Sequence, residues 1–150
     1  MRIMSLISSL VLLGAGALAN GADPVAPDKG ALVYARPGSC VTCHQANGAG
    51  LPGVFPPLAG SEWLNRDSAV LIKIVLHGLQ GPIAVRGQSY TTAMPGMAAA
   101  LKDDEIADVL NYMRTTWGKI GEPVTGAAVA KIRASEATRT TMWTSKELRP

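Results

Sequence analysis

Cys40-Val41-Thr42-Cys43-His44 forms a Cys-x-x-Cys-His motif, and the rest of the 150-residue chain is best interpreted around it. This pattern is the attachment signature of a c-type haem. Two thiols three positions apart can each add to one of the two vinyl groups of a haem, which leaves the adjacent imidazole beneath the iron. The motif therefore predicts one covalent haem c per chain, bound by Cys40 and Cys43, with His44 as an iron ligand.

Two other chemistries use closely spaced cysteines. A thioredoxin-like redox pair belongs in a βαβ unit, and no segment here has the pattern of a strand followed by a crossover helix. A structural zinc ion needs four Cys or His ligands, but His77 is the only other histidine in the chain. The haem interpretation is favoured over both.

Residues 1–19 have the composition of a secretory signal peptide. Arg2 precedes an uncharged apolar run that ends in the small-residue triplet Ala17-Leu18-Ala19. We expect cleavage near Ala19 and a periplasmic, exported protein. The alternative is an uncleaved membrane anchor, because residues 3–22 are uncharged and long enough to span a bilayer.

Cleavage would leave residues 20–150, a length that fits one domain. Without Arg2 the formal net charge falls from +3 to +2, and two haem propionates would bring it near zero. Nucleic-acid binding therefore has no support. Residues 119–150 hold six Lys or Arg against three Glu, an excess that could form a docking surface but is more often a solvated face.

Strand patterns are few and short, whereas several segments have helical signals. Gly30 lies within one of these segments, and a glycine inside a helix costs about 1 kcal/mol against alanine. Its presence suggests that another helix crosses there closely. The expected helices are 29–34 after Asp28, 68–77 after Asp67, 103–117 before Gly118, and a short one after Thr125; a small hairpin or extended turn is expected between 81 and 90.

The segment after the motif, up to Gly60, is too rich in Gly and Pro for regular structure. A loop this apolar should not face water, so we expect it to cover the proximal side of the haem. The covering side chains are expected to be Val54, Phe55 and Leu58. A ligand imidazole needs its other ring nitrogen held by an acceptor, and we expect the Pro56 carbonyl, or a neighbouring one, to accept from His44.

Met94 stands before Pro95 and Gly96, outside any expected helix, where it has little packing reason to be. It is well placed to offer a thioether to the iron from the side opposite His44. The pattern therefore predicts His44 and Met94 as the two iron ligands.

Two other residues could take part in haem binding. His77 is an alternative iron ligand, although a histidine in the last turn of a helix also complements the helix dipole. Trp63 could pack on the haem edge or donate its indole N–H to a propionate, and an ordinary core role is equally open.

The Cys-x-x-Cys-His motif, the Pro-x-Leu loop, the Met94-Pro95 segment and the closing amphipathic helix together resemble bacterial class I monohaem c-type cytochromes. The resemblance covers roughly residues 28–118, which leaves 119–150 as a C-terminal extension of a domain over 20–150. It implies an all-α, cytochrome c-like small helical domain wrapped around one covalently attached haem. The first and last helices of that fold cross, here at Gly30 and Tyr112.

The resemblance also implies roles for single residues. It places the distal ligand at Met94, the carbonyl that holds the proximal histidine at Pro56, and a hydrophobe beside the haem at Met97. Lys102 stands where similar sequences have Ser or Thr, so we expect the helix cap to shift to Asp103. The extension resembles the tails of cytochromes that accompany dehydrogenases or terminal oxidases.

The expected function is one-electron transfer by a six-coordinate haem, as a soluble carrier or as the cytochrome subunit of a dehydrogenase or oxidase. The protein would then serve redox partner proteins and would not itself be an enzyme. The alternative is a haem enzyme or gas sensor, peroxidase-like, with a displaceable distal ligand. The distal segment offers Tyr90, Thr91 and Thr92 for such chemistry, but no spare His, Glu or Asp.

Overall fold

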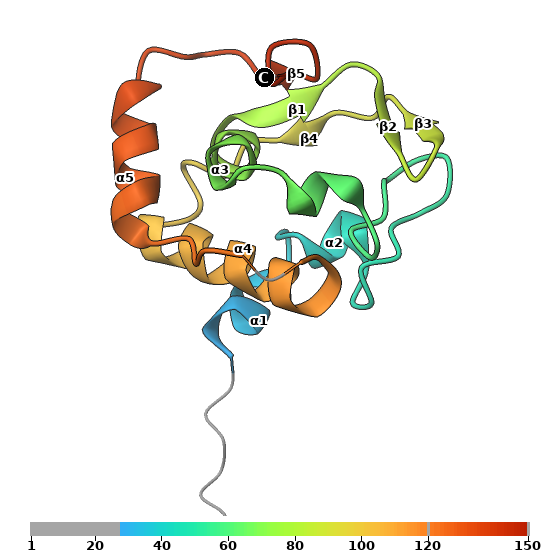
Figure 1. Ribbon diagram of the computed structural model, residues 1–150, viewed down its shortest axis with the longest axis horizontal. Helices are drawn as coiled ribbons and strands as arrows, with labels where there is room; N and C mark the ends of the chain where they lie inside the picture. The colour runs from blue at the N-terminus through green and yellow to red at the C-terminus, as the bar shows by residue number, and fades with distance from the viewer. Residues whose placement is uncertain (1–27, 120, 150) are drawn as a thin grey trace, which may run out of the picture.

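The computed structural model describes residues 28–119 and 121–149, so the signal peptide expected over 1–19 lies outside the described residues. Helices dominate, and the strands lie on the side of the body away from α1 (Figure 1). In chain order the elements are α1 (Lys29–Tyr34), α2 (Val41–His44), the 3-10 helix η1 (Glu62–Asn65), α3 (Ser68–His77), β1 (Gly78–Gln80), β2 (Ile83–Val85), β3 (Gln88–Tyr90), β4 (Met94–Pro95), α4 (Asp103–Trp117), α5 (Gly126–Ser135) and β5 (Trp143–Thr144).

The first and the long fourth helix cross at Gly30. The Asp28 carboxylate begins α1 by accepting from the Gly30 backbone N–H at 2.8 Å. A Cβ atom at Gly30 would lie 2.6 Å from Tyr112 Cβ on α4, so only a glycine allows this approach. The aromatic rings of Tyr34, Tyr112 and Trp117 pack against one another beside the crossing. The predicted crossing of Gly30 and Tyr112 is confirmed.

The third helix runs through the middle of the molecule. Its bounds are those expected from the sequence, and Gly78, with φ of 83°, ends it. The Asp67 side chain stands at the N-cap position but makes no capping hydrogen bond. The buried residues of α3 are Leu71, Ile72, Ile74, Val75 and Leu76. Burial on more than one face explains why three apolar residues follow one another at Ile74, Val75 and Leu76.

The N-terminus of α4 differs from the expectation. Lys102 occupies the N-cap position with extended backbone, and its N–H donates to the Glu105 carboxylate at 2.9 Å. The expected shift of the cap to Asp103 is wrong. Asp103 is already the first residue of the helix. The carboxylate of Glu105, in the first helical turn, accepts from the Lys102 N–H and so completes the cap at Lys102.

Two small sheets make the all-α description approximate. In the first, β1 pairs with β4 antiparallel and with β5 parallel, which gives the order β4-β1-β5. In the second, β2 and β3 form a hairpin. Its turn residues Arg86 and Gly87 have φ of 52° and 78°, the left-handed backbone that two-residue hairpin turns need. The hairpin expected between 81 and 90 is confirmed.

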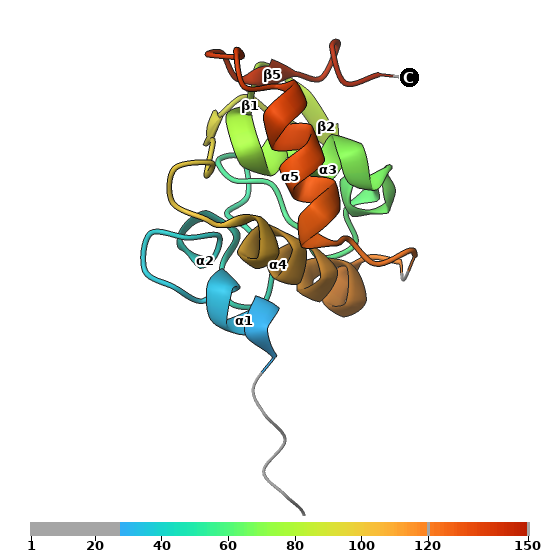
Figure 2. The ribbon, with the colours of Figure 1, turned by 90° about the vertical axis from the view of Figure 1, so that its left-hand side faces the viewer.

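The C-terminal extension packs on the body. Thr125 begins α5 by accepting from the Ala128 N–H at 3.2 Å, as expected. Val129 of α5 is fully buried in the main core. Figure 2 shows α5 running from α4 to the sheet, where the chain continues into β5. Among the described residues, no helix combines the length and the apolar character needed to cross a bilayer.

Part of the positive charge of the extension is used within the molecule. Arg133 donates to the Asp103 carboxylate at 2.7 Å and to the carbonyls of Ala98 and Leu101. These contacts fasten α5 to the segment before α4. Arg133 therefore belongs neither to a docking surface nor to a purely solvated face, because its guanidinium makes contacts within the molecule.

Candidate haem site

The Cys-x-x-Cys-His motif forms the single turn of α2, with Cys40 at its N-cap position. Residues three and four positions apart lie on one face of a helix. Cys40 and His44 accordingly line one cavity, and Cys43 lines a second pocket that shares His44 with it. Both cysteines are partly buried. The local helical turn thus directs two thiols and one imidazole to the same space.

His44 is held by the Pro56 carbonyl oxygen, which lies 2.9 Å from its Nδ1 atom. A carbonyl can only accept, so Nδ1 carries the proton and Nε2 keeps a free lone pair. Burial lowers the pKa of His44, and the hydrogen bond to Pro56 opposes that shift more weakly. The ring is therefore kept neutral and in the tautomer that a metal ligand needs. The acceptor predicted from the sequence, Pro56, is confirmed.

The loop after the motif covers the haem cavity with only some of the three expected side chains. Leu58 lines the cavity and Phe55 lines the second pocket. Val54, however, is 40% exposed. The loop turns back on itself where the backbones of Leu51 and Phe55 exchange hydrogen bonds of 2.8 and 2.9 Å. The expectation for Val54 is wrong because this turn directs its tip to solvent.

Met94 lies on β4. Like His44, it lines both the cavity and the second pocket. Met97 lines the cavity too. The Met97 N–H donates to the Val75 carbonyl at 2.8 Å, which ties this segment to the end of α3. The structure therefore brings the two predicted iron ligands to one space, with the second methionine beside them.

The cavity has a volume of about 90 Å³. Its walls are almost wholly apolar and come from both the N-terminal loop and the later helices and strands. Sequence reasoning missed Leu79 on β1 and Ile83 and Val85 on β2, although alternation along the hairpin was an available signal for the last two. The main lining residues are Cys40, His44, Pro56, Leu58, Leu71, Val75, Leu79, Met94, Met97 and Met113. Thiols, a neutral imidazole and a thioether around an apolar space fit a haem.

The structure places one of the two other candidates, Trp63, at the cavity and the other, His77, away from it. The Trp63 ring lines the cavity, but its indole N–H donates to the Ala84 carbonyl at 2.9 Å. His77 is not among the lining residues, and its buried Nε2 has no partner among the described residues. The described residues also hold no group of three or more His, Cys, Asp or Glu side chains placed to bind a bare metal ion.

A family model for cytochrome c matches residues 27–117. The chain belongs to the cytochrome c family. Its similarity to a cytochrome c-552 of Thermus thermophilus is 44% identity over 141 residues, which is 88% of each chain. It is also 37% identical over 125 residues to the cytochrome c subunit of the quinone alcohol dehydrogenase of Gluconacetobacter polyoxogenes, covering 82% of this chain and 26% of that subunit.

A further relative is the cytochrome c subunit of gluconate 2-dehydrogenase from Pantoea cypripedii, which is 35% identical over 113 residues. That match covers 71% of this chain and 24% of the relative. The chain is therefore a class I c-type cytochrome with one covalent haem c, and its function is electron transfer in a redox chain rather than catalysis. The family and fold expected from the sequence are confirmed.

Proposed function

We propose that this cytochrome attaches its haem through Cys40 and Cys43 and holds the iron between His44 and Met94. One observation carries the proposal: His44 and Met94 line the same apolar cavity, while the Pro56 carbonyl fixes His44 Nδ1 at 2.9 Å. This contact leaves Nε2 as the ring atom available to a metal. A soft sulfur and a neutral imidazole nitrogen are a common ligand pair for electron-transfer haem iron.

When bound, the haem supplies a one-electron Fe(III)/Fe(II) couple. The chain sets the conditions for that couple. The Met94 thioether is a soft donor that favours the ferrous state, and the apolar walls disfavour the additional charge of the ferric state. The covalent and hydrogen-bonded frame around α2 keeps His44 in place in both states, which reduces the reorganisation that accompanies each transfer.

A peroxidase-like or gas-sensing role needs a displaceable distal ligand and polar groups directed at it. The Tyr90 hydroxyl donates to the Gln88 side chain at 3.2 Å instead. Thr92 lines only the second pocket and not the cavity. These positions favour a closed iron site and a carrier.

The matched pair Met94→Ala and Met97→Ala tests this proposal, because both residues line the cavity. Met94→Ala should abolish the sulfur-to-iron charge-transfer absorption of the ferric protein and let carbon monoxide bind the ferrous protein readily. It should also lower the reduction potential by about 59 mV for each tenfold loss in relative affinity for ferrous iron. Met97→Ala should do none of these. Equal effects from the two variants would refute Met94 as the ligand.

We also propose that residues 1–19 are a signal peptide and that residues 20–150 act in the periplasm. The support is the charged, apolar and small-residue order that ends at Ala19. Intact-mass analysis of the holoprotein from its own cell should give a chain beginning at Asn20. A full-length chain in the membrane fraction would instead indicate an uncleaved anchor.

The partners we propose are redox proteins that dock over the second pocket, which shares His44 and Met94 with the cavity and is also lined by Cys43, Phe55, Ala93 and Pro95. The similarity to cytochrome subunits of two dehydrogenases supports an enzyme of that class as a partner. Because a carrier must leave quickly, the contact should bury less than about 1,200 Å². Isolation of the tagged holoprotein from its own cell should recover a redox enzyme. Recovery of unrelated proteins only would contradict this assignment.

A further inference from the structure

The C-terminal extension reaches the proposed distal ligand through the sheet. Leu79 on β1 is the register partner of Met94 on one side and of Trp143 on the other. Directly paired residues on neighbouring strands direct their side chains to the same face. Consistent with this, Leu79 and Trp143 are buried in one apolar cluster, and Met94 packs against it. A single row of side chains therefore joins residue 143 to the haem cavity.

The strand that carries Met94 has little support of its own. β4 is two residues long and β1 is three. Isolated two-stranded ribbons are marginally stable, and a third strand with an apolar face is needed for independent stability. β5 provides that third strand by pairing along the other edge of β1.

Trp143 is itself clamped. Its side chain is buried, with the residue 7% exposed. The Arg139 guanidinium lies 3.4 Å from the ring centroid and Lys73 Nζ of α3 lies 4.7 Å from it. Its indole N–H is buried without a partner among the described residues. Nearby cations stabilise an aromatic ring through its faces, so the two cations hold Trp143 by its ring and not by a hydrogen bond of its indole N–H.

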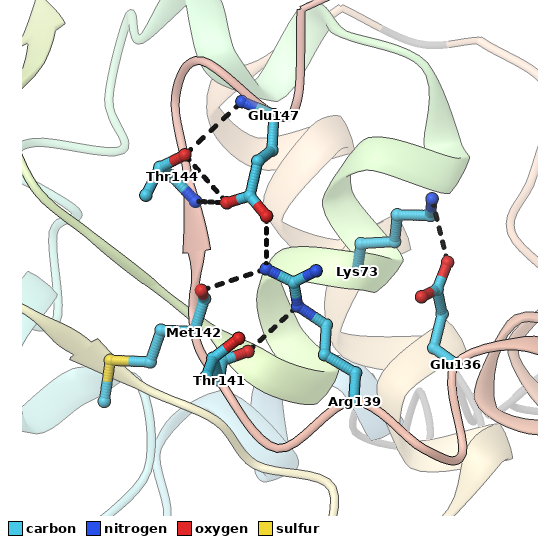
Figure 3. Close-up of polar contacts among 7 residues, drawn as sticks. All are labelled: Lys73, Glu136, Arg139, Thr141, Met142, Thr144 and Glu147. Carbon is cyan, nitrogen blue, oxygen red and sulfur yellow. Dashed lines mark hydrogen bonds and ion pairs between the residues drawn. The ribbon is translucent and has the colours of Figure 1, made fainter.

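A closed polar network holds this clamp in place (Figure 3). Arg139 donates to the carbonyls of Thr141 and Met142 at 2.9 and 3.1 Å and to the Glu147 carboxylate at 2.8 Å. Glu147 in turn accepts from the Thr144 N–H and hydroxyl at 2.8 and 2.7 Å. The network fixes the segment on both sides of Trp143.

A second anchor lies at the end of α5. Lys73 forms an ion pair of 2.9 Å with Glu136, which follows α5, while its Nζ also lies over the Trp143 ring. The hydrogen bonds between Thr144 and Glu147 have the form of a capping box, but they close a turn after β5 and do not start a helix. Contacts of Glu136, Arg139 and Glu147 therefore hold the segment that contains β5.

We propose that Trp143, clamped by Arg139, is a positioning residue that holds Met94 at the haem iron through Leu79, so the extension 119–150 governs how readily the distal ligand leaves. The inference rests on the proposed role of Met94. It assigns the extension a part in ligand retention beyond its contribution to overall stability.

Imidazole binding to the ferric holoprotein tests the proposal, because imidazole binds only when Met94 leaves the iron. Local opening raises the apparent affinity of a ligand by the factor by which the open state becomes more populated. Trp143→Ala should raise the imidazole affinity about tenfold and weaken the sulfur-to-iron absorption. Trp143→Phe retains a ring between the two cations and should stay close to the unmutated protein.

Val129→Ala is the matched control, because Val129 is a fully buried residue of the same extension that belongs to the main core and not to the apolar cluster of Leu79 and Trp143. It should lower Tm without changing imidazole affinity. Arg139→Gln, a milder change, gives a second measure if Trp143→Ala yields little holoprotein, and it should raise the affinity by a smaller factor.

Unchanged imidazole affinity in both Trp143→Ala and Arg139→Gln would overturn the proposal, as would an equal rise in Val129→Ala. The unmutated protein distinguishes failure of the positioning role of Trp143 from failure of the ligand assignment of Met94. If its sulfur-to-iron absorption is present and disappears in Met94→Ala, the ligand assignment stands whatever Trp143 does. If that absorption is absent, both the ligand assignment and the positioning role fail.

Discussion

The two sides of the cavity are built in different ways. The proximal side comes from one stretch of chain, residues 40–58, whose contacts are local: His44 N–H donates to the Cys40 carbonyl, and Leu58 N–H to the Gly48 carbonyl. The distal side combines β1, β4 and β5, and β5 lies more than sixty residues from β1 in the sequence. Local contacts close short loops at low entropic cost. The proximal side should therefore be the firm one and the distal side the one that opens.

The largest effect should follow removal of the covalent proximal attachment. Cys40→Ala combined with Cys43→Ala should leave no haem on the polypeptide after acid and organic-solvent extraction, because coordination bonds do not survive that treatment whereas thioethers do. A chain built around a missing group also loses much of its core, so the yield of folded protein should fall sharply. Thr42→Ala, an exposed change inside the same motif, should retain the haem. Haem in the organic phase of the unmutated protein would contradict the attachment.

A second effect should separate the distal side from the proximal side. Gly78 has φ of 83°, and a Cβ there would clash with the Met94 carbonyl and lie 2.8 Å from the Gly96 nitrogen. Gly78→Ala should cost about 3 kcal/mol of unfolding free energy and displace β4. Gly81→Ala shares the positive φ but meets no atom within 4 Å. It should cost about 1 kcal/mol and leave the sulfur-to-iron absorption intact.

The corresponding proximal change should spare the distal ligand. Gly50 has φ of 64°, and a Cβ there would lie 2.6 Å from the Pro56 carbonyl oxygen that holds His44. Gly50→Ala should lower stability by about 2 kcal/mol and shift the reduction potential, while the thioethers and α2 keep the haem attached. Gly53→Ala, open and with positive φ in the same loop, is the control. Loss of Met94 ligation in Gly50→Ala but not in Gly78→Ala would reverse the comparison.

The smallest effect should appear in acid, at the turn that fastens β5. Hydrogen bonds from Arg139 and then Thr144 lower the pKa of Glu147 from 4.5 to about 2. A carboxylate whose pKa is lower in the folded than in the unfolded state contributes its full stabilisation of the fold at pH values above the unfolded-state pKa. That contribution is lost as the pH falls from 4.5 toward 2. Glu147→Gln should lower Tm slightly at pH 7 and much less at pH 3. Exposed Glu122→Gln should show no such difference, and an equal effect of Glu147→Gln at both pH values would contradict the assignment.

This contrast also explains what could be predicted from the sequence. The proximal side was accessible because motif, loop and acceptor follow one another in the chain. This order narrowed the acceptor of His44 to Pro56 or a neighbouring carbonyl, and the family resemblance placed it at Pro56. Met94 was accessible because a methionine between a hairpin and Pro95 has no helix to pack into. The crossing at Gly30 was accessible because a glycine inside a helix is destabilising relative to alanine, which suggests that another helix packs closely there.

Other features depend on contacts that no local pattern reports. Strand β5 has two residues, too few for a period, and its partner β1 is distant in the chain. Val54 faces solvent because of a backbone turn that composition does not specify. At Lys102 the cap is set by Glu105 from inside the helix, whereas residue preference favoured Asp103. In each case tertiary or backbone geometry outweighed the intrinsic preference of the residue.

Carbon monoxide binding to the unmutated ferrous protein tests the central claim most directly, because it asks whether the chain closes the iron on both sides. If Met94 holds the sixth position, binding should be slow, and its rate should reach a plateau at high carbon monoxide concentration, set by departure of the thioether. Trp143→Ala should raise that plateau. Fast binding in the unmutated protein, with a rate proportional to carbon monoxide concentration throughout, would show an open iron and contradict the assignment of a six-coordinate electron carrier.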